Sequence, residues 1–397
     1  MVKKKKIALL GNMNNNFSAI CRYLLDCGYD AKLFTFDYEK EYPHFHPSAD
    51  CYDDSWKSFT HELSWGSAKT FLKVDRSYLQ EFFAEFDIII GCGYAPAFVH
   101  KADRRLDVFV PHGSDINHLP YLEKYYPKDV GRFLFVGRNQ KSGIVRARHV
   151  FCDRWTEDLE RKINRLNLQG KRHFSIMPAI YTPQYLNLEI DANEPVIGDL
   201  VKIRSNSDLI IFHHIRHSWV NPVDKIAMKS NNYLFEGVAE YKKQNKNVRI
   251  SIVTFEYGED VARSKQLIEK LGIQESVFWF PISPRKMIMK MMNFADVVTG
   301  EFNYSFIAYG AILEGMAMSK PIMHRRDDEL YKNTHHDLYP MIYAASADDI
   351  VNGIESLLTE PQRYRAMGEQ SNLWLQKNMV DIPIQELTKI IDSSLIN

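Results

Sequence analysis

The sequence predicts an α/β protein built from two Rossmann-like units. At 397 residues the chain is too long for one ordinary core. In both halves, short apolar runs alternate with segments of helical periodicity, which is the rhythm of parallel doubly wound sheets. Between the halves, 179–209 carries prolines and mixed charge with little periodicity and is interpreted as a linker. We therefore expect an N-terminal domain over 1–190, a C-terminal domain over 206–375, and a C-terminal helix over 376–397 that packs back on the N-terminal domain.

Apolar runs predict the strands of the first unit. Apolar residues recur at helical spacing from Phe17 to Cys27, and Gly28 ends this helix. The segment lies between the first two strands, so the order is strand, loop, helix, strand. The expected strands are Ile7–Leu10, Ala31–Phe36, Asp87–Gly91, Val108–Pro111, Val150–Asp153 and Phe174–Met177.

The second unit repeats the pattern. Strands are expected at Leu209–His213, Arg249–Phe255, Val277–Phe280, Val297–Gly300 and Pro321–His324. Helices are expected near Tyr233–Asn245, Ala262–Leu271, Pro284–Phe294 and Ala308–Met318, and from Ala347 onward the tail is helical and amphipathic. We expect the carboxyl ends of both sheets to face a cleft between the domains, where ligands of open α/β sheets bind.

Composition restricts the partners. Lys and Arg together number 50, as do Asp and Glu, so no global field attracts nucleic acid, and none is expected as a partner. Five scattered cysteines without a Cys-x-x-Cys spacing indicate reduced thiols in the cytosol. No apolar run approaches the roughly 20 residues that cross a bilayer. We predict a cytoplasmic protein. The Lys3–Lys6 run is interpreted as a solvated entry to the first strand, with peripheral association at the inner membrane face as the alternative.

The segment Thr299–Met323 is the most informative part of the chain. It is expected to form a loop that closes on the start of a short helix containing Glu314. A helix N-terminus at the mouth of a parallel sheet can receive an anion, because free N–H groups and the helix dipole both face outward. A carboxylate further along the helix can accept hydrogen bonds from the hydroxyls of a ribose. The combination predicts a ligand that is both phosphorylated and hydroxylated.

Two loops of the first half are candidate site elements. Gly11 opens the run Gly-Asn-Met-Asn-Asn-Asn, which lacks the Gly-x-Gly-x-x-Gly fingerprint of dinucleotide-binding proteins. Gly11 allows a tight turn and close backbone approach, although a plain turn with helix-capping asparagines is equally compatible. His112 follows the fourth strand and could bind a sugar hydroxyl or transfer a proton. The alternative is a satisfied loop histidine with Asp115 as a helix cap.

Cations follow the first strand of the second half. His213, His214 and His217 suggest a metal site, but the segment is predicted to be strand and then loop, where these side chains do not share a face. Arg216 and Lys229 are better suited to a diphosphate, because a forked guanidinium and a point charge complement each other. The sequence contains no Asp-x-Asp pair. We therefore expect neither a metal nor another cofactor, and the diphosphate to be neutralised by these cations and by helix termini.

These motifs resemble those of retaining glycosyltransferases of the GT-B fold, in particular family four. The resemblance covers nearly the whole chain. Arg216 and Lys229 fall in a segment similar to the family's strand–Arg…Lys–helix element. The other matching motifs are LLGNMNNN, VPHGSDI, MMNFADVV and AILEGMAMSKPIM.

The resemblance assigns roles by position. It implies that Glu314 binds the ribose of a nucleotide donor, that Arg216 and Lys229 bind its diphosphate, that His112 lies near the reacting sugar, and that Gly11 lies where the first loop meets donor phosphate and acceptor. Where the family has the first glutamate of its E-x7-E motif, this chain has Phe306. Glu301 could replace that glutamate if the loop runs differently, or the backbone amides around 304–308, including those of Phe306 and Ile307, could hold the sugar and phosphate.

The implied activity is transfer of a sugar from a nucleoside-diphosphate sugar to a hydroxyl of a saccharide, lipid-linked or other acceptor, with retention of configuration, in polysaccharide or glycoconjugate synthesis. Two alternatives use the same fold: an epimerase, and a pseudo-transferase that binds a nucleotide sugar without turnover. The nucleotide base, the sugar and the acceptor are left open.

Overall fold

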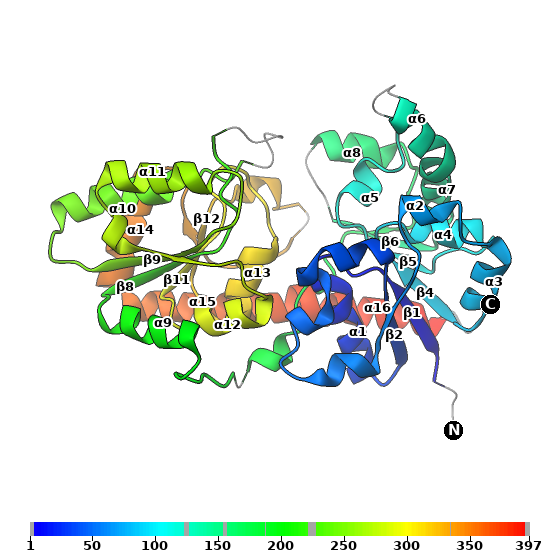
Figure 1. The fold of residues 1–397 in the computed structure, drawn as a ribbon, viewed down its shortest axis with the longest axis horizontal. Helices are drawn as coiled ribbons and strands as arrows, with labels where there is room; N and C mark the ends of the chain where they lie inside the picture. Colours follow the sequence, from blue (N-terminus) through cyan, green and yellow to red (C-terminus); the bar gives the residue numbers. More distant parts are fainter. Residues whose placement is uncertain are drawn as a thin grey trace. The chain divides into compact units, whose positions relative to one another are not determined.

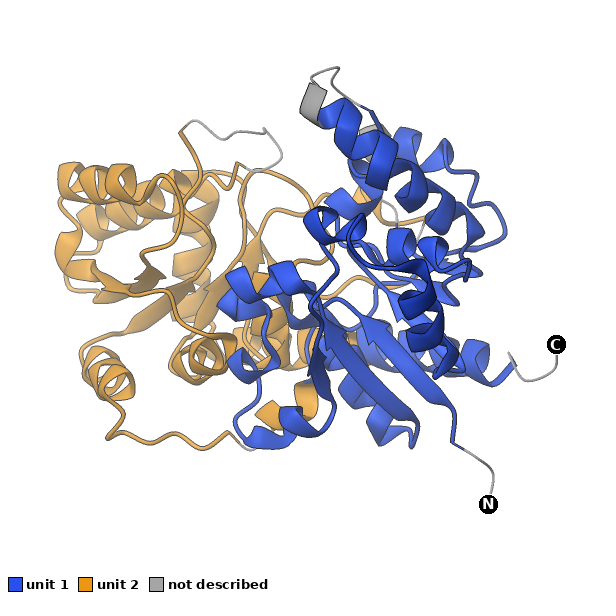
Figure 2. Cartoon of the chain, turned by 45° about the vertical axis from the view of Figure 1, so that its right-hand side comes forward, with its two compact units in different colours: residues 1–181, 377–397 blue, residues 182–376 orange. Residues whose placement is uncertain are grey.

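The structure, a computed structural model, describes residues 4–122, 127–153, 157–186, 188–220, 228–333 and 335–393. The chain forms two compact units (Figures 1 and 2). Unit 1 contains residues 1–181 and 377–397, and unit 2 contains residues 182–376. Each unit is an α/β structure with its own parallel sheet. The predicted pair of Rossmann-like units is therefore confirmed, and the predicted cleft between them stays a prediction.

Unit 1 is built on a parallel sheet of seven strands in the order β3-β2-β1-β4-β5-β6-β7. Ile7 of β1 pairs with Ala31 of β2 on one side and with Ile88 of β4 on the other, so the strand order reverses between β1 and β4. The strands are β1 (Lys6–Leu10), β2 (Asp30–Thr35), β3 (Thr60–Glu62), β4 (Ile88–Gly91), β5 (Val108–Phe109), β6 (His149–Phe151) and β7 (Arg172–His173).

Helices cover both faces of this sheet. Alternate residues of β1 enter two different apolar clusters, with Ala8 and Leu10 in one and Ile7 and Leu9 in the other, as the two-residue period of a strand requires. The second cluster includes residues of α1 and of the C-terminal helix α16, which belongs to unit 1. The helices are α1 (Asn16–Asp26), α2 (Ala68–Phe71), α3 (Arg76–Ala84), α4 (Ala95–Lys101), α5 (Ser114–Asn117), α6 (Pro127–Arg132), α7 (Arg138–Arg146), α8 (Glu157–Asn164) and α16 (Ile382–Ser393).

Unit 2 contains a parallel sheet of six strands in the order β10-β9-β8-β11-β12-β13, which reverses between β8 and β11. The strands are β8 (Leu209–His213), β9 (Ile250–Phe255), β10 (Val277–Phe280), β11 (Val297–Thr299), β12 (Ile322–His324) and β13 (Ile342–Tyr343). The helices are α9 (Pro195–Ser205), α10 (Asn232–Gln244), α11 (Val261–Leu271), α12 (Arg285–Met292), α13 (Gly310–Ala317), α14 (Ala347–Thr359) and α15 (Pro361–Leu375).

The sheet edges differ from the prediction. The strand expected at Phe174–Met177 is wrong: β7 is Arg172–His173, and Phe174 is exposed. The edge strands β3 and β13 were not expected, because two or three residues are too short to form an apolar run. Part of the expected linker is the helix α9, which Pro195 begins at a position where its missing N–H costs nothing.

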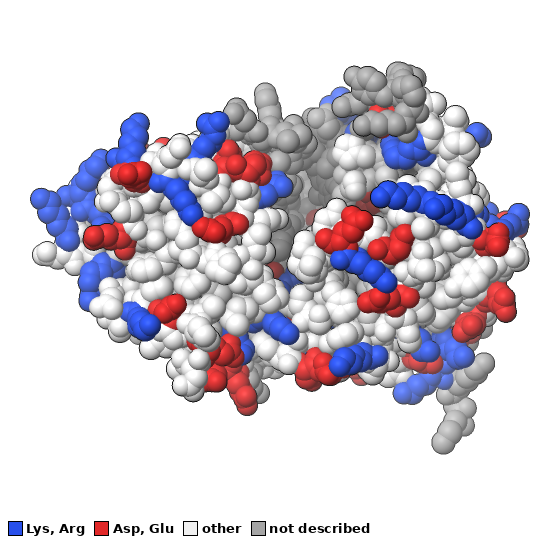
Figure 3. Space-filling model, in the orientation of Figure 1, with Lys and Arg blue, Asp and Glu red and all other residues white. Residues whose placement is uncertain are grey.

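The N-terminal lysines are used in different ways. Lys3 lies outside the described residues. Lys5 is buried, and its ammonium donates to the carbonyl of Ile391 in α16, so it is not a solvated entry residue. Within the described ranges, no helix has the length and apolarity that crossing a membrane needs. On the face drawn in Figure 3, acidic and basic side chains are interspersed.

Candidate active site

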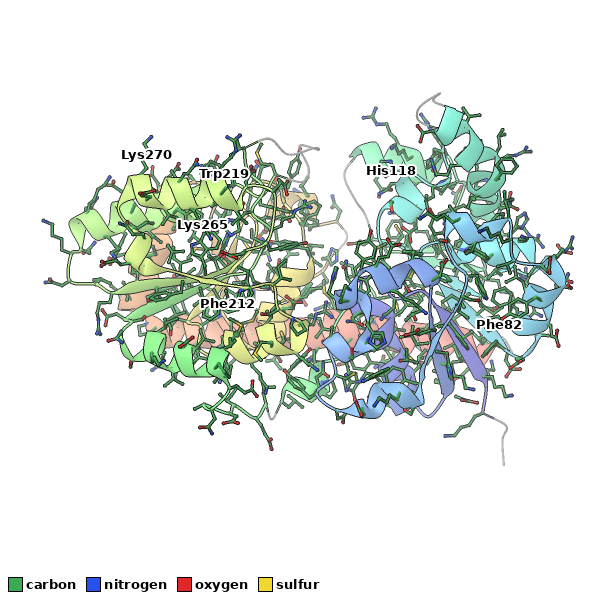
Figure 4. The ribbon with its side chains drawn as sticks, viewed as in Figure 1. Phe82, His118, Phe212, Trp219, Lys265 and Lys270 are labelled. Carbon is green, nitrogen blue, oxygen red and sulfur yellow. The ribbon has the colours of Figure 1, made fainter. Side chains whose placement is uncertain are left out.

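The carboxyl edge of the unit 2 sheet brings the predicted donor residues together. β8 ends at His213 and β11 at Thr299, and these neighbouring strands flank the point where the strand order reverses. Loops that leave an open sheet at such a point diverge and leave room for a ligand. Arg216 follows β8, and Glu301 follows β11. In Figure 4, Phe212 marks the end of β8 within this sheet.

Buried hydrogen bonds fix the loop that carries Arg216. The His213 ring lies 2.6 Å from Thr299 Oγ1 through Nδ1 and 2.9 Å from Asn231 Nδ2 through Nε2. Asn231 also donates to the Arg216 carbonyl at 3.3 Å and accepts from the Ser218 N–H at 3.1 Å. Because these groups are buried, each needs its partner. His213 thus connects the ends of β8 and β11, and Asn231 connects His213 to the backbone of the loop that carries Arg216.

The next part of this loop is anchored to α11. The Asp260 carboxylate accepts from the backbone N–H groups of Trp219 and Val220 at 2.7 and 2.8 Å. The Trp219 indole donates to Ser264 Oγ at 2.9 Å (Trp219 is labelled in Figure 4). His217 contacts the same Ser264 and Thr254, at 2.9 and 3.0 Å. The buried side chains of His213 and His217 therefore stabilise the loop through hydrogen bonds.

Lys229 and Arg216 both act on Glu301. The Lys229 ammonium lies 2.7 Å from Glu301 Oε2, and the Glu301 side chain is only 2% exposed. Burial raises the pKa of Glu301, and the charges of Lys229 and Arg216 oppose that rise. The Arg216 guanidinium lies 3.9 Å from Glu259 and keeps 38% of its side chain exposed. Lys229 therefore pairs with a buried carboxylate whose charge the more distant Arg216 also favours, and Arg216 stays accessible to a ligand.

Glu314 is held between two cationic or polar partners. Its Oε2 lies 2.7 Å from His214 Nε2, and its Oε1 accepts from Arg285 Nε at 2.8 Å. Burial would raise the pKa of Glu314, but the bond from His214 and the charge of Arg285 outweigh it and lower the pKa to about 2. The side chain is therefore an ionised acceptor. Each carboxylate oxygen has a second lone pair available for a hydroxyl.

The loop before Glu314 offers backbone donors. α13 begins at Gly310, and no side chain caps its N-terminus in the described structure. Phe306 is half-buried against Tyr309, with ring centroids 6.2 Å apart, and Ile307 is buried with its carbonyl accepting from Tyr339 at 3.0 Å. Within the described ranges, the backbone N–H groups of Phe306, Ile307 and Ala308 donate to no protein acceptor. This loop can therefore receive an anion through its backbone.

The asparagine loop of unit 1 is held by its own side chains. Asn12 donates to Asn15 Oδ1 at 2.8 Å and to the Phe45 carbonyl at 2.5 Å, and Asn15 donates to the carbonyls of His44 and His46. Asn15 has φ +61°, a left-handed conformation that asparagine tolerates. These two asparagines therefore build the loop, as the plain-turn interpretation expects.

Gly11 lies where a side chain cannot fit. Its φ is +85°, and an added Cβ would lie 2.8 Å from Cys92 Sγ and 2.9 Å from the Phe36 ring. The Glu39 carboxylate accepts from the backbone N–H groups of Asn12 and Phe36 at 2.6 and 2.8 Å. Burial raises the pKa of Glu39 to about 7. Packing alone requires glycine at position 11.

His112 lies beside the same loop of unit 1. The Asp115 carboxylate accepts from the backbone N–H groups of His112 and Gly113 at 3.0 Å. Asp115 lies inside α5, whose N-cap residue is Gly113, so the expected role of Asp115 as a helix cap is wrong. The imidazole Nδ1 lies 3.3 Å from Asn16 Nδ2, whereas Nε2 is buried without a hydrogen-bond partner in the described structure. Burial lowers the pKa of His112 to about 4. The ring is therefore neutral and has one nitrogen available.

Several residues that hydrogen-bond to the predicted site residues were not predicted from the sequence. His214 and Arg285 bind Glu314, and Asn231 joins His213 to the loop that carries Arg216. Arg285 had a usable signal, because it follows Pro284 at the start of a predicted helix near the same sheet edge. Asn231 is two residues from Lys229, but nothing in its spacing predicts a bond to His213.

The comparisons with known proteins agree with this architecture. Residues 226–374 match the family model described as glycosyl transferases group 1. No curated protein matches the chain significantly in sequence.

Several solved structures share the fold over nearly the full length. A glycosyltransferase from Rickettsia africae has a TM-score of 0.62 at 14% identity and covers 100% of both chains. Anabaena HepE, solved with UDP and glucose, has a TM-score of 0.59 at 13% identity, covering 98% of this chain and 100% of its own. A putative UDP-N-acetylglucosamine 2-epimerase from Listeria monocytogenes has a TM-score of 0.57 at 13% identity, covering 100% and 97%. The chain thus has the GT-B fold, as its sequence predicts, and residues 226–374 of its second unit match the glycosyl transferases group 1.

Proposed function

We propose that this protein is a retaining glycosyltransferase that moves a sugar from a nucleoside-diphosphate sugar to a hydroxyl acceptor, either a saccharide or a lipid-linked molecule, in polysaccharide or glycoconjugate synthesis. The observation that carries the proposal is the arrangement at the carboxyl edge of unit 2. Two cations on loops, the start of α13 and the ionised Glu314 within that helix lie around the reversal point. Together they match a diphosphate linked to a ribose.

Each group has a defined part in this proposal. Glu314 accepts hydrogen bonds from ribose hydroxyls. Arg216, Lys229 and the N–H groups before α13 bind the diphosphate. Negative charge builds on the diphosphate as its bond to the sugar breaks, so these groups stabilise the transition state more than the ground state. The departing phosphate accepts the proton of the acceptor hydroxyl. We propose that the reaction needs no metal, since the sequence lacks an Asp-x-Asp pair and these cations can neutralise the diphosphate.

The donor can be identified by ligand stabilisation. UDP-, GDP- and ADP-sugars are added to the purified chain and the unfolding temperature is measured. A donor present at 100 times its dissociation constant stabilises the fold by about 2.7 kcal/mol, so the correct nucleotide stands out. UDP is tested first, since HepE was solved with UDP and with UDP-glucose.

Turnover separates the proposal from its alternatives. The labelled donor is incubated with saccharide and lipid-linked acceptors, and all products are analysed. A glycosylated acceptor with retained configuration supports the proposal. A new epimer of the donor indicates the epimerase, a class represented among the solved structures. Binding without any turnover indicates the pseudo-transferase.

The role of Arg216 is tested by substitution, because its side chain is 38% exposed and its removal is expected to leave the fold intact. Arg216→Ala should lower kcat with the identified donor by about 100-fold, judged from the loss of a single donor group elsewhere. An exposed arginine of the same unit, Arg363 in α15, provides the matched control Arg363→Ala. Unchanged turnover in Arg216→Ala would exclude Arg216 from diphosphate binding.

A further inference from the structure

The asparagine run after β1 contains one residue whose side chain leaves its own loop. Asn12 and Asn15 direct their amides at each other and at the 44–46 backbone. Asn16, the first residue of α1, instead directs its amide at the neighbouring loop, where Nδ2 lies 3.3 Å from His112 Nδ1. The sequence predicts turn and cap roles for these asparagines and no contact between Asn16 and His112.

The chemistry of an amide nitrogen determines what this contact does. Asn16 Nδ2 carries two protons and no accepting lone pair, so it can only donate. His112 Nδ1 must then accept with a free lone pair. The proton of a neutral imidazole therefore resides on Nε2. The low pKa that burial gives to His112 keeps the ring neutral near pH 7.

The rest of the surroundings fix the direction of the ring. Phe17, the next residue of α1, packs edge-on against it, with centroids 5.7 Å apart and planes at 80°. Asp115 holds the His112 backbone through its N–H. Nε2 is buried and has no partner among the described residues. A buried N–H without an acceptor is costly, and such a group in a native protein calls for an explanation.

We propose that Asn16 is a positioning residue that fixes His112 in its Nε2–H tautomer, so that the imidazole donates a hydrogen bond to an oxygen of the bound substrate. This inference rests on the proposed function, which supplies the sugar or acceptor oxygen. It also makes His112 a donor, because a nitrogen that already carries the proton cannot accept one. The sequence left two roles open for His112, binding a sugar hydroxyl and transferring a proton. The Nε2–H tautomer favours binding of a hydroxyl or sugar oxygen over proton abstraction.

The tautomer can be measured without substrate. The full chain is labelled with ¹⁵N-histidine, and ring nitrogens are observed by long-range proton–nitrogen correlation, with His112 assigned from its absence in His112→Gln. The expected wild-type spectrum has a protonated Nε2 and an unprotonated Nδ1. In Asn16→Asp the side chain is a carboxylate that can only accept, so Nδ1 should become protonated. A wild-type Nδ1–H, or the same spectrum in both proteins, would overturn the proposal.

A second variant covers the case in which the new carboxylate prevents folding. Asn16→Ala removes the amide without adding a charge, and the single tautomer should give way to a mixture. A spectrum unchanged from wild type contradicts the proposal. Gln80→Glu, an exposed amide-to-carboxylate change in α3 of the same unit, is the matched control and should leave the His112 signals unmoved.

An activity measurement separates this inference from the function on which it rests. With the identified sugar donor, Asn16→Asp should lower kcat by about 100-fold and change the KM for that sugar donor by less than about threefold. The reason is that the hydrogen bond from the imidazole to the substrate oxygen, which is stronger in the transition state than in the bound substrate, is lost. Wild-type kcat in Asn16→Asp with an altered tautomer would overturn the role in substrate binding. If the wild-type chain turns over no nucleotide sugar, the proposed function fails, while the spectra still decide the tautomer.

Discussion

Lys229 and Glu301 form a nearly buried ion pair, 2.7 Å between Nζ and Oε2, within the electrostatic influence of the partly exposed Arg216. Burying such a pair costs desolvation free energy. Removing one partner destabilises the fold, because it leaves the other charge buried and unpaired. Lys229 is therefore both a structural partner of Glu301 and a proposed ligand of the diphosphate. A simple deletion of Lys229 would confuse the two roles.

The first prediction separates these roles. Lys229→Ala leaves the Glu301 carboxylate buried and unpaired, so the free energy of unfolding should fall by about 3 kcal/mol. The double variant Lys229→Ala/Glu301→Gln removes the charge as well and should recover more than half of that loss. Urea denaturation followed by tryptophan fluorescence measures both. If the double variant regains its stability but still binds the donor as wild type does, Lys229 is not a diphosphate ligand.

The second prediction concerns the ionised state of Glu314. Its folded pKa of about 2 lies below the ordinary value of about 4.3, so its ionisation stabilises the fold above pH 4.3 and this contribution is lost as the pH falls toward 2. Protonated glutamate resembles glutamine. The stability difference between wild type and Glu314→Gln should therefore be largest near pH 7, about 3 kcal/mol, and shrink on acidification below pH 4.3.

Chemical denaturation of both proteins across this pH range checks the expectation. Glu269→Gln, an exposed change in α11, is the control and should differ little from wild type at every pH. A constant difference between wild type and Glu314→Gln would show that the ionised form is not what His214 and Arg285 stabilise.

The third prediction follows from the buried histidines. Burial lowers the pKa of His217 to about 4, whereas the unfolded chain protonates near 6.5. The unfolded state then binds more protons between these values, so stability falls as the pH drops from 6.5 to 4, by about 1.4 kcal/mol per pH unit for each such histidine. His217→Gln should reduce this slope. The exposed His336→Gln should leave it unchanged, and equal slopes in all three proteins would contradict the account.

The fourth prediction concerns Ser319, which follows the end of α13. Its φ is +54°, in the left-handed region that glycine adopts more readily than other residues. A side chain in this left-handed region costs roughly 1 kcal/mol, so Ser319→Gly should raise the free energy of unfolding by about that amount. Gly368→Ala, which would bring a Cβ within 2.2 Å of the Ser319 carbonyl, should destabilise the same junction. Calorimetric unfolding temperatures of the two variants should move in opposite directions.

The sequence predicted the central strands well and the sheet edges poorly. β1, β8 and β9 are buried apolar runs, so their composition alone identifies them. β13 is a two-residue strand with one exposed residue, and its identity depends on pairing with β12 rather than on its own residues.

The candidate site shows the same division. Glu314 and Lys229 belong to local motifs and could be found by spacing. The bond between Asn16 and His112 joins residues 96 apart in sequence and exists only because β1 and β5 end at the same sheet edge. Such a long-range contact cannot be predicted from the residues around either position.

The C-terminal helix α16 has a consequence for how this protein is made. Leu387 and Ile391 complete an apolar cluster that begins with Ile7 and Leu9. During synthesis, domains generally fold as their residues leave the ribosome. Unit 2, continuous over residues 182–376, can therefore assemble while unit 1 still exposes the surface that α16 covers. The core of unit 1 is therefore completed only after unit 2 has been synthesised, and until then its open apolar cluster is available for association with other chains.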